Sequence, residues 1–230
     1  LVGGTSTEMP TIRILPQENS IAVLDGSWPR SQMYWDALYS HANKRTVCLM
    51  WGGNEHNSLY FFQEAFAFDF MSTFVKRLVH KAQIISRRTV RDRFYKLSLS
   101  EMESVCIEIC ARHPRKLVIL GTPPPKADAD KLRLMFAAEP HFQKWAASIG
   151  VNSENVKITD ASVRLKLWHE LQSCFREIAQ RCNGTFVSVP AHVMDKDGFL
   201  KEEYWAPDVT HANELYGQIM LRHVTQEIVI

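Results

Sequence analysis

A carboxylate and an imidazole stand three positions apart near the end of the chain, as Asp208 and His211. In a turn, this spacing lets the carboxylate hold the imidazole through one ring N–H, and the other ring nitrogen stays free to act as a general base. The same spacing also suits an Asp that caps a helix, followed by a His in its first turn. The pair is therefore a candidate for acid–base chemistry, with a helix cap as the alternative.

A second group of polar residues follows the apolar run at residues 46–50. This group is the sequence GGNEHN at residues 52–57. A short, continuous apolar run that stops at glycine is typical of a buried strand. Polar side chains placed where such a strand ends indicate a functional loop. Glu55 and His56 either line the pocket of that loop or cap a helix that begins near residue 58.

Similar apolar runs predict the other strands, and helical periodicity predicts the segments between them. Strands are expected at residues 20–24, 116–120 and 185–189, with a further candidate at 11–15. Apolar residues at helical spacing predict helices over residues 100–113, 160–182 and 212–228. Asp160 is expected to cap the second of these helices, and Asn183-Gly184 to end it.

Alternating strands and helices predict a parallel sheet covered by helices on both faces, which is a three-layer α/β/α architecture. The 230 residues suit a single domain. In sheets of this kind, ligands bind beyond the carboxyl ends of the strands. The candidate site therefore comprises the residues that follow each strand: Gly26-Ser27, residues 52–57, Gly121-Thr122, and the segment after Val189 that contains Trp205, Asp208 and His211.

Taken together, these motifs resemble the SGNH hydrolases, also called the GDSL esterase family. In that family, short sequence blocks supply Ser, Gly, Asn and His. The sequence GGNE at residues 52–55 is similar to the block Gly-x-Asn-Asp/Glu, and DVTH at residues 208–211 is similar to Asp-x-x-His. Gly26, after the predicted strand at 20–24, matches the glycine of the second block. The resemblance spans most of the chain and implies a flavodoxin-like α/β fold.

The resemblance also implies a Ser–His–Asp mechanism without metal or cofactor. His211 would take the proton of a serine and return it to the leaving alcohol, while Asp208 fixes the imidazole tautomer. The Asn54 amide and the Gly26 N–H would donate to the oxyanion, where one donor is worth roughly 3–4 kcal/mol. Substrate contacts are expected from side chains or backbone at the same edge of the sheet: Gly53, His56, Thr122 and Trp205.

The nucleophile belongs to the block that matches least well. The family pattern is Gly-Asp-Ser at the end of the first strand, followed by a helix. The nearest match is GTST at residues 4–7, with Thr in place of Asp, and Pro10 disfavours a long helix after it. We expect Ser6 to be the nucleophile, with Ser27 as the second candidate and a site without a nucleophile as the third. Only Leu1-Val2-Gly3 precede this match, which is too few for a whole strand, so we expect residues to be missing before this stretch, within it, or both.

The segment from residue 58 to residue 100 is longer than an ordinary crossover, so we expect a lid or an inserted helical subdomain there. Residues 59–75 are rich in phenylalanine and would cover an acyl pocket, form a dimer contact or make a buried helix. Basic side chains follow over residues 76–96. They indicate a solvated helix face or a contact for an anionic polymer or membrane surface.

Composition narrows the function classes. The net charge of +2, from 27 basic and 25 acidic residues, is not the basic excess of a nucleic-acid binder. No apolar run approaches the ~20 residues of a membrane span. The five cysteines are scattered, which argues against a disulfide framework and favours the cytoplasm over the periplasm or secretion. Cys106, Cys110 and His113 lack a second ligand pair, so we expect core packing and not zinc.

The leading hypothesis is a serine esterase that hydrolyses small acyl esters. By family resemblance, acetyl esters on a carbohydrate are a suitable substrate. Two alternatives remain open. One is a binding or accessory domain of the same fold without a nucleophile, and the other is an O-acyltransferase in which an alcohol replaces water as the acyl acceptor. A homo-oligomer is compatible with either hypothesis.

Overall fold

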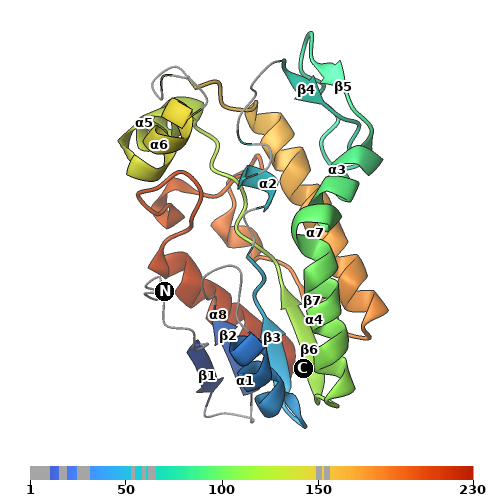
Figure 1. Ribbon diagram of the computed structural model, residues 1–230. Coiled ribbons are helices and arrows are strands. Elements are labelled where there is room, and N and C mark those ends of the chain that lie inside the picture. The colour runs from blue at the N-terminus through green and yellow to red at the C-terminus, as the bar shows by residue number, and fades with distance from the viewer. Residues whose placement is uncertain are drawn as a thin grey trace.

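A computed structural model describes residues 11–15, 20–24, 32–52, 55–58, 61, 66–148, 152 and 156–229. In this part of the chain, five strands form one sheet in the order β1-β2-β3-β6-β7 (Figure 1). Their bounds are β1 Thr11–Leu15, β2 Ser20–Leu24, β3 Thr46–Leu49, β6 Lys116–Leu120 and β7 Thr185–Val187. The predicted strands are therefore confirmed, and two of them are slightly shorter than expected.

The sheet is parallel except at one edge. Strands β2, β3, β6 and β7 pair in parallel, but β1 pairs antiparallel with β2, with Leu15 opposite Ser20. The reason is the length of the link between them. A parallel pair needs a crossover of roughly a dozen residues or more, and residues 16–19 are too few.

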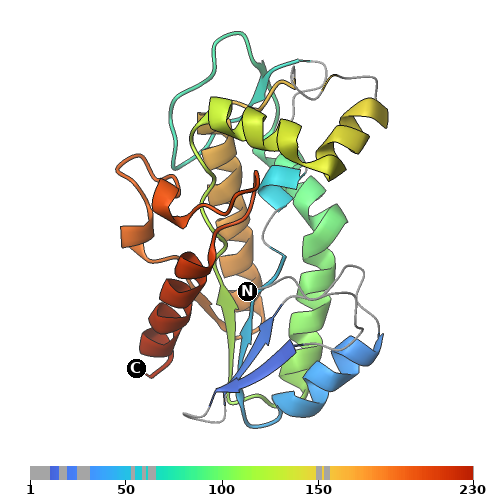
Figure 2. The same cartoon turned by 90° about the vertical axis from the view of Figure 1, so that its left-hand side faces the viewer.

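Helices cover both faces of the sheet. The bounds of the main ones are α1 Gln32–Ala42, α4 Ser100–Ala111, α7 Ala161–Arg181 and α8 Glu214–Val229. Figure 2 shows α8 on one side of the strands and α1 and α4 on the other. The three-layer α/β/α architecture is thus confirmed, together with the three predicted helices. Helix α1 was not predicted from the sequence.

The sheet divides the core into two apolar clusters because successive side chains of a strand point to opposite faces. Val47 and Leu49 of β3 pack in one cluster with residues of α1, α4 and α7. Cys48, between them, packs in the other cluster with Tyr216 and Met220 of α8. Strand β6 alternates in the same way. This packing fixes the position of each strand along its own axis, and hence the position of the residues that follow its carboxyl end.

The ends of α7 follow the sequence signals. The side chain of Asp160 accepts a hydrogen bond from Ser162 N at 2.8 Å, which confirms the predicted N-cap. The helix ends at Arg181, and Asn183 then takes a positive φ of 51°. That left-handed conformation is common just after a helix and is tolerated by Asn. The two ends of α7 are thus fixed by the cap at Asp160 and by the turn at Asn183.

Residues 66–86 are not helical, whereas residues 87–99 are. Strands β4 Phe68–Asp69 and β5 Gln83–Ile84 form a small parallel pair, and the chain becomes helical only at α3 Arg87–Phe94 and a π-helical turn, Tyr95–Leu99, that leads into α4. We call residues 66–86 the arm. A buried helix over residues 66–75 is therefore excluded. Whether the arm acts as a lid stays a prediction.

The remaining elements lie beyond the carboxyl ends of the strands (Figures 1 and 2). They are the short helix α2 Glu55–Ser58, the pair α5 Ala129–Ala138 and α6 Pro140–Ser148, and two 3₁₀ turns, Ala191–Val193 and Glu202–Tyr204. Within the described ranges, no helix is long and apolar enough to cross a membrane.

Candidate active site

Asp208 and His211 are in contact. The Nδ1 atom of His211 lies 3.1 Å from Oδ2 of Asp208. The other carboxylate oxygen accepts from the backbone N–H groups of Thr210, at 2.8 Å, and His211, at 2.7 Å. The carboxylate therefore closes the turn and holds the imidazole at the same time. The predicted pairing of a carboxylate with one imidazole nitrogen is present.

The alternative, in which Asp208 caps the last helix, does not hold. Helix α8 begins at Glu214, and the group that accepts from its first turn is Asn213 Oδ1, which lies 3.1 Å from Tyr216 N. Asp208 thus lies before the cap and serves the turn that carries His211. The His211 side chain is 71% exposed and that of Asp208 is 30% exposed. One edge of the imidazole is held by protein while the ring remains accessible.

The contact changes the acidity of both groups. The hydrogen bond that the His211 ring donates to Asp208, together with the charge of that carboxylate, raises the pKa of His211 above the ordinary value, although partial burial opposes this shift. Burial alone would raise the pKa of Asp208. The hydrogen bonds from the His211 ring and from the backbone of His211 and Thr210 outweigh burial and hold that pKa well below its usual range. Asp208 is therefore a carboxylate at neutral pH, as the orienting member of such a pair must be.

A buried lysine holds the loop that carries the pair. The Nζ atom of Lys126 donates to the backbone carbonyls of Ala206, at 2.8 Å, and of Asp208. Burial lowers the pKa of this lysine to about 8, and the charges of Asp208 and Glu139 oppose the shift only in part. Lys126 also lowers the pKa of His211 through its charge. It therefore acts on both the shape of the loop and the basicity of the imidazole.

The same loop is held from a second side by Glu139, just after α5. Its Oε1 accepts from the backbone N–H of Val209 at 3.0 Å. Within the loop, the N–H of Ala206 donates to the carbonyl of His211 at 3.1 Å. The side chain of Val209 is buried in a third apolar cluster with Phe61, Leu132 and other residues of α5 and α6. Both the backbone and an apolar side chain of the Asp208 turn are thus fixed.

Arg164 links this loop to the region of α2. It is fully buried in α7 and donates to the carbonyls of Thr159 (3.0 Å), Lys126 and Ala127 (3.0 Å). Its guanidinium lies 5.9 Å from the centre of the Phe61 ring. Phe61 N donates to Asn57 O of α2 at 2.6 Å. One continuous set of contacts therefore connects α2, directly after Asn54 in the chain, with the loop of Asp208.

A polar chain also fixes the start of α2. The indole N–H of Trp51 donates to Ser98 Oγ at 2.6 Å, and that hydroxyl donates to Glu55 Oε1 at 2.6 Å. All three side chains are buried or half-buried. A Cβ on Gly52 would lie 3.2 Å from Glu55 Oε1, so glycine there allows the carboxylate to approach the backbone. Glu55 is thus a structural anchor. It is not the cap of a helix that begins near residue 58, because α2 begins at Glu55 itself and ends at Ser58.

Two predicted substrate contacts are enclosed by protein. His56 is 1% exposed. Thr122 is also buried, with its hydroxyl accepting from Gln172 Nε2 at 2.8 Å and its carbonyl accepting from Trp168 Nε1 at 3.0 Å. Both side chains are enclosed by protein and do not present their polar groups to solvent. A direct contact with substrate stays untested for both.

Trp205, the other predicted substrate contact in the described residues, is half-buried beside the loop. Its indole N–H donates to Leu200 O at 2.8 Å, and Lys126 Nζ lies 5.5 Å from the centre of its ring. The other expected site residues lie outside the described residues: Ser6, Gly26, Ser27, Gly53 and Asn54. Their roles remain predictions that rest on the sequence.

The residues that sequence reasoning missed are Lys126, Glu139 and Arg164. Each contacts a partner distant in the chain, so no local spacing could have revealed it. A weak signal was present for Arg164 and Lys166, which stand within the apolar stretch of α7 and are both fully buried. A charged side chain in such a stretch indicates a buried partner. All five cysteines are free, and Cys106 and Cys110 pack in or against the core as expected.

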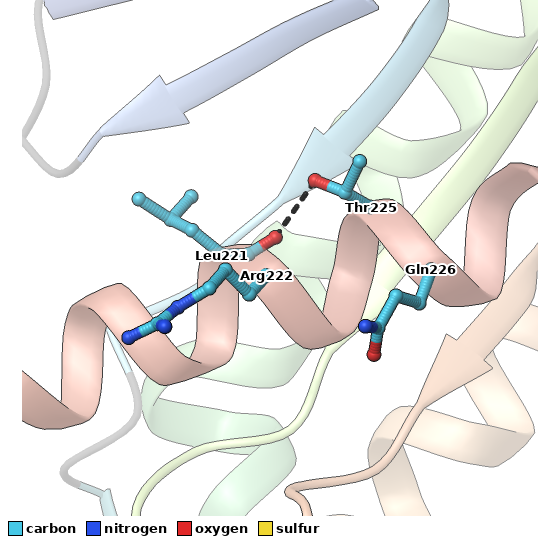
Figure 3. A pocket seen from close by; sticks show the side chains of 4 residues that line it. All are labelled: Leu221, Arg222, Thr225 and Gln226. Atoms are coloured by element: carbon cyan, nitrogen blue, oxygen red, sulfur yellow. Dashed lines mark hydrogen bonds between the residues drawn. The ribbon is translucent and has the colours of Figure 1, made fainter.

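A surface hollow of about 320 Å³ lies on α8, away from this loop. It is lined by Leu221, Arg222, Thr225 and Gln226, and the Thr225 hydroxyl donates to the Leu221 carbonyl within the helix (Figure 3). Its lining comes from consecutive turns of one helix. In contrast to the loop of Asp208, it brings no acid–base pair together.

Comparison with solved structures gives distant matches. They include the native aryl esterase of M. smegmatis, 16% identical with a TM-score of 0.39, over 84% of this chain and 64% of that one. The periplasmic domain of a lipopolysaccharide acetyltransferase from Salmonella ser. Paratyphi A is 11% identical with a TM-score of 0.41, over 86% and 61%. A carbohydrate acetylesterase from Sinorhizobium meliloti is 16% identical with a TM-score of 0.39, over 97% and 74%.

The chain thus spans less than two thirds of the length of the first two of these structures, at 64% and 61%. No protein-family model matches the chain, and no curated protein matches it.

Proposed function

We propose that the chain is a serine esterase of the SGNH type, in which His211 is the general base and Asp208 orients it. The observation that carries the proposal is the 3.1 Å contact between His211 Nδ1 and Asp208 Oδ2 in a loop held by Lys126 and Glu139. With Nδ1 bound to the carboxylate, Nε2 is the nitrogen that can accept a proton from a nucleophile. The exposed ring leaves that nitrogen within reach of a substrate.

The elements around Ser27 favour it over Ser6 as the nucleophile. The family pattern places the serine between a strand and a helix, and Ser27 stands in the link between β2, which ends at Leu24, and α1, which begins at Gln32. Strand β2 also pairs in parallel with β3, the strand that leads to Asn54. Too few residues separate Ser6 from Thr11, the start of β1, to hold a helix. Ser6 remains the second candidate.

The reaction follows from these assignments. The serine hydroxyl attacks the ester carbonyl carbon while His211 takes its proton, which forms a tetrahedral oxyanion. The protonated imidazole gives the proton to the alcohol oxygen as the C–O bond breaks, and an acyl-enzyme remains. Water attacks that ester with His211 again as the base, and the acid leaves with the free serine restored.

The oxyanion would be held by the Asn54 side-chain amide and by the backbone N–H of the nucleophilic serine. The Gly26 N–H, matched to the second block, is the further donor where Ser6 is the nucleophile. Donors of this kind act only if they are fixed before the reaction. The chain from Trp51 through Ser98 to Glu55 supports this role, because it anchors both neighbours of the segment that contains Gly53 and Asn54. Thr122 and His56 would support the base of the site through their buried contacts.

We assign the substrate class as small acyl esters, with acetyl esters of a carbohydrate as the form to test first. The family resemblance supports the acyl ester. The 71% exposure of His211 supports an open site that accepts a large alcohol portion. An open site also admits an alcohol in place of water, so acyl transfer to a second alcohol is the alternative within the same chemistry.

The proposal is tested by the hydrolysis of p-nitrophenyl acetate and of an acetylated oligosaccharide. The wild-type protein is expected to release acetate, and His211→Ala to lose at least about 10³-fold in kcat/KM. His192→Ala is the matched control, because His192 is an exposed histidine on a 3₁₀ turn outside the loop. Equal activity of the two variants, or no turnover by the folded wild-type protein, would favour a non-catalytic binding domain.

A further inference from the structure

The arm, residues 66–86, concentrates exposed apolar side chains. Of the nine large apolar residues that are markedly exposed in the described part of the chain, five belong to the arm. The most exposed of these five residues of the arm is Met71, at 62%. The others are Phe66, Phe74, Leu78 and Ile84. Exposed apolar residues that occur singly need no explanation, but a group of them on one protrusion marks an interaction surface.

Basic side chains stand among these apolar ones. Lys76, Arg77 and Lys81 are exposed, and none of them forms a salt bridge with a described residue. The acid of the arm is Asp69, which is fully buried. Arg87 and Arg91, just beyond the arm, are instead bound to Glu170 at 2.6 and 2.8 Å. The exposed charge of the arm is therefore positive and not neutralised.

The arm is ordered by contacts that leave these residues outside. Asp69 receives two hydrogen bonds from the buried Lys166 Nζ, at 2.8 and 2.9 Å, and others from Phe70 N and Val79 N. Lys166 also donates to Arg77 O. Phe70 is fully buried in the main core. Ser72 Oγ closes the turn after Phe70 by accepting from the backbone N–H groups of Phe74, at 3.2 Å, and Val75, at 3.4 Å. The exposed residues of the arm are thus held in place and do not result from a loose loop.

The arm lies at one end of the molecule, where a partner can contact it. Figures 1 and 2 show β4 and β5 beyond α2, at the end of the molecule toward which the carboxyl ends of the sheet strands point. A planar partner that met this end could touch the turns on both sides of β4 and β5 together.

We propose that the arm binds the surface of an anionic lipid bilayer. Met71, Leu78 and Ile84 would enter the boundary between head groups and acyl chains, while Lys76, Arg77 and Lys81 remain at the anionic head groups. Long basic side chains and apolar ones mixed on one surface are the combination that such interfaces favour. An anionic surface also supplies the charge complementary to the arm. This proposal stands independently of the esterase assignment.

The test is co-sedimentation of the full chain with vesicles of phosphatidylcholine alone, and with vesicles of equal parts phosphatidylcholine and phosphatidylglycerol. Binding is expected to the anionic vesicles and to weaken with salt. Reversing three charges, in Lys76→Glu/Arg77→Glu/Lys81→Glu, should weaken binding by at least about 100-fold, since each basic residue contributes roughly fivefold. Met71→Ser/Leu78→Ser/Ile84→Ser should also lose binding.

Matched controls come from exposed residues elsewhere. Leu134→Ser, which changes an exposed apolar residue of α5, and Arg222→Glu, on α8, should bind anionic vesicles like the wild-type protein. Far-UV circular dichroism and thermal unfolding of the arm variants should match those of the wild-type protein, which shows that they fold. The proposal is overturned if the wild-type protein does not bind anionic vesicles, or if the arm variants bind as well as the controls. It is also overturned if light scattering shows that the arm instead joins two copies of the chain.

Discussion

The ammonium group of Lys126 donates to the backbone carbonyl of Asp208, the residue whose carboxylate holds the His211 imidazole. A cation from the loop after β6 thus fixes the turn of the acid–base pair and lies close enough to lower the pKa of His211. The proposed chemistry depends on this turn, because three groups of Asp208 must each meet a different partner. One carboxylate oxygen contacts the His211 ring, the other accepts from backbone N–H groups, and the backbone carbonyl accepts from Lys126.

Asp208→Asn should remove the charge that holds the imidazole and reduce kcat by roughly 10³–10⁴-fold, as expected when the orienting carboxylate of a triad is lost. The pKa of His211 should fall toward the ordinary value near 6.5, because its main cause of elevation is gone. The residual rate of the variant should therefore reach half its maximum at a lower pH than that of the wild type. Rate–pH profiles and imidazole NMR titration measure this shift. An unchanged pKa would contradict the assigned contact.

Lys126→Met should shift the pKa of His211 in the opposite direction, which is upward. The buried cation lowers the pKa of His211, so its removal should move the rate–pH profile to higher pH. Loss of the two carbonyl contacts should also loosen the turn and lower kcat by about 100-fold, with a smaller change in KM. Lys126→Arg should restore part of the rate because it restores the charge. A merely structural role for Lys126 would predict lower stability with no change in the pH profile.

The depressed pKa of Lys126 also predicts a dependence of stability on pH. Its pKa is about 8 in the folded chain and near 10.5 when exposed, so between these values the unfolded chain binds one more proton. Stability contributed by this group therefore rises as the pH increases from about 8 to 10.5, by up to about 3 kcal/mol. The measurement is the difference in unfolding free energy between wild type and Lys126→Met across that range. A difference that stays constant or falls would contradict the assigned pKa.

Asp69→Asn should destabilise the fold by about 3–5 kcal/mol, because it leaves the fully buried Lys166 cation without its carboxylate. The matched control is Arg88→Ala, which breaks the exposed pair of Arg88 and Asp92 and should change stability by less than about 1 kcal/mol. Urea unfolding at neutral pH measures both. Similar stabilities of the two variants would show that the Asp69–Lys166 contact does not hold the arm.

The parts of the fold that sequence reasoning predicted are those with local signals. Short apolar runs located the strands, and helical spacing located α4, α7 and α8. The antiparallel pairing of β1 was missed although the short link between Leu15 and Ser20 was visible in the sequence. Strand propensity alone carries no direction, and the length of the link should have decided the matter.

The site divides in the same way. The contact between Asp208 and His211 could be predicted because the two residues are three positions apart in one turn. Lys126, Glu139 and Arg164 could not, because their partners are brought to them only by packing of α5, α7 and the final loop. Thr122 was placed correctly at the end of β6, but its hydroxyl is used by Gln172 of α7, a partner that no local pattern indicates.

The most direct test of the esterase assignment is to treat the protein with a fluorophosphonate and to locate the adduct by peptide mass spectrometry. A nucleophilic serine activated by His211 should be labelled, and the expected position is Ser27. Labelling should vanish in His211→Ala and in Ser27→Ala and persist in His192→Ala and Ser6→Ala. An adduct at Ser6 would move the nucleophile and keep the mechanism. If the folded wild-type protein takes no label, or if His211→Ala is labelled equally, the assignment of Asp208 and His211 to a serine hydrolase is contradicted.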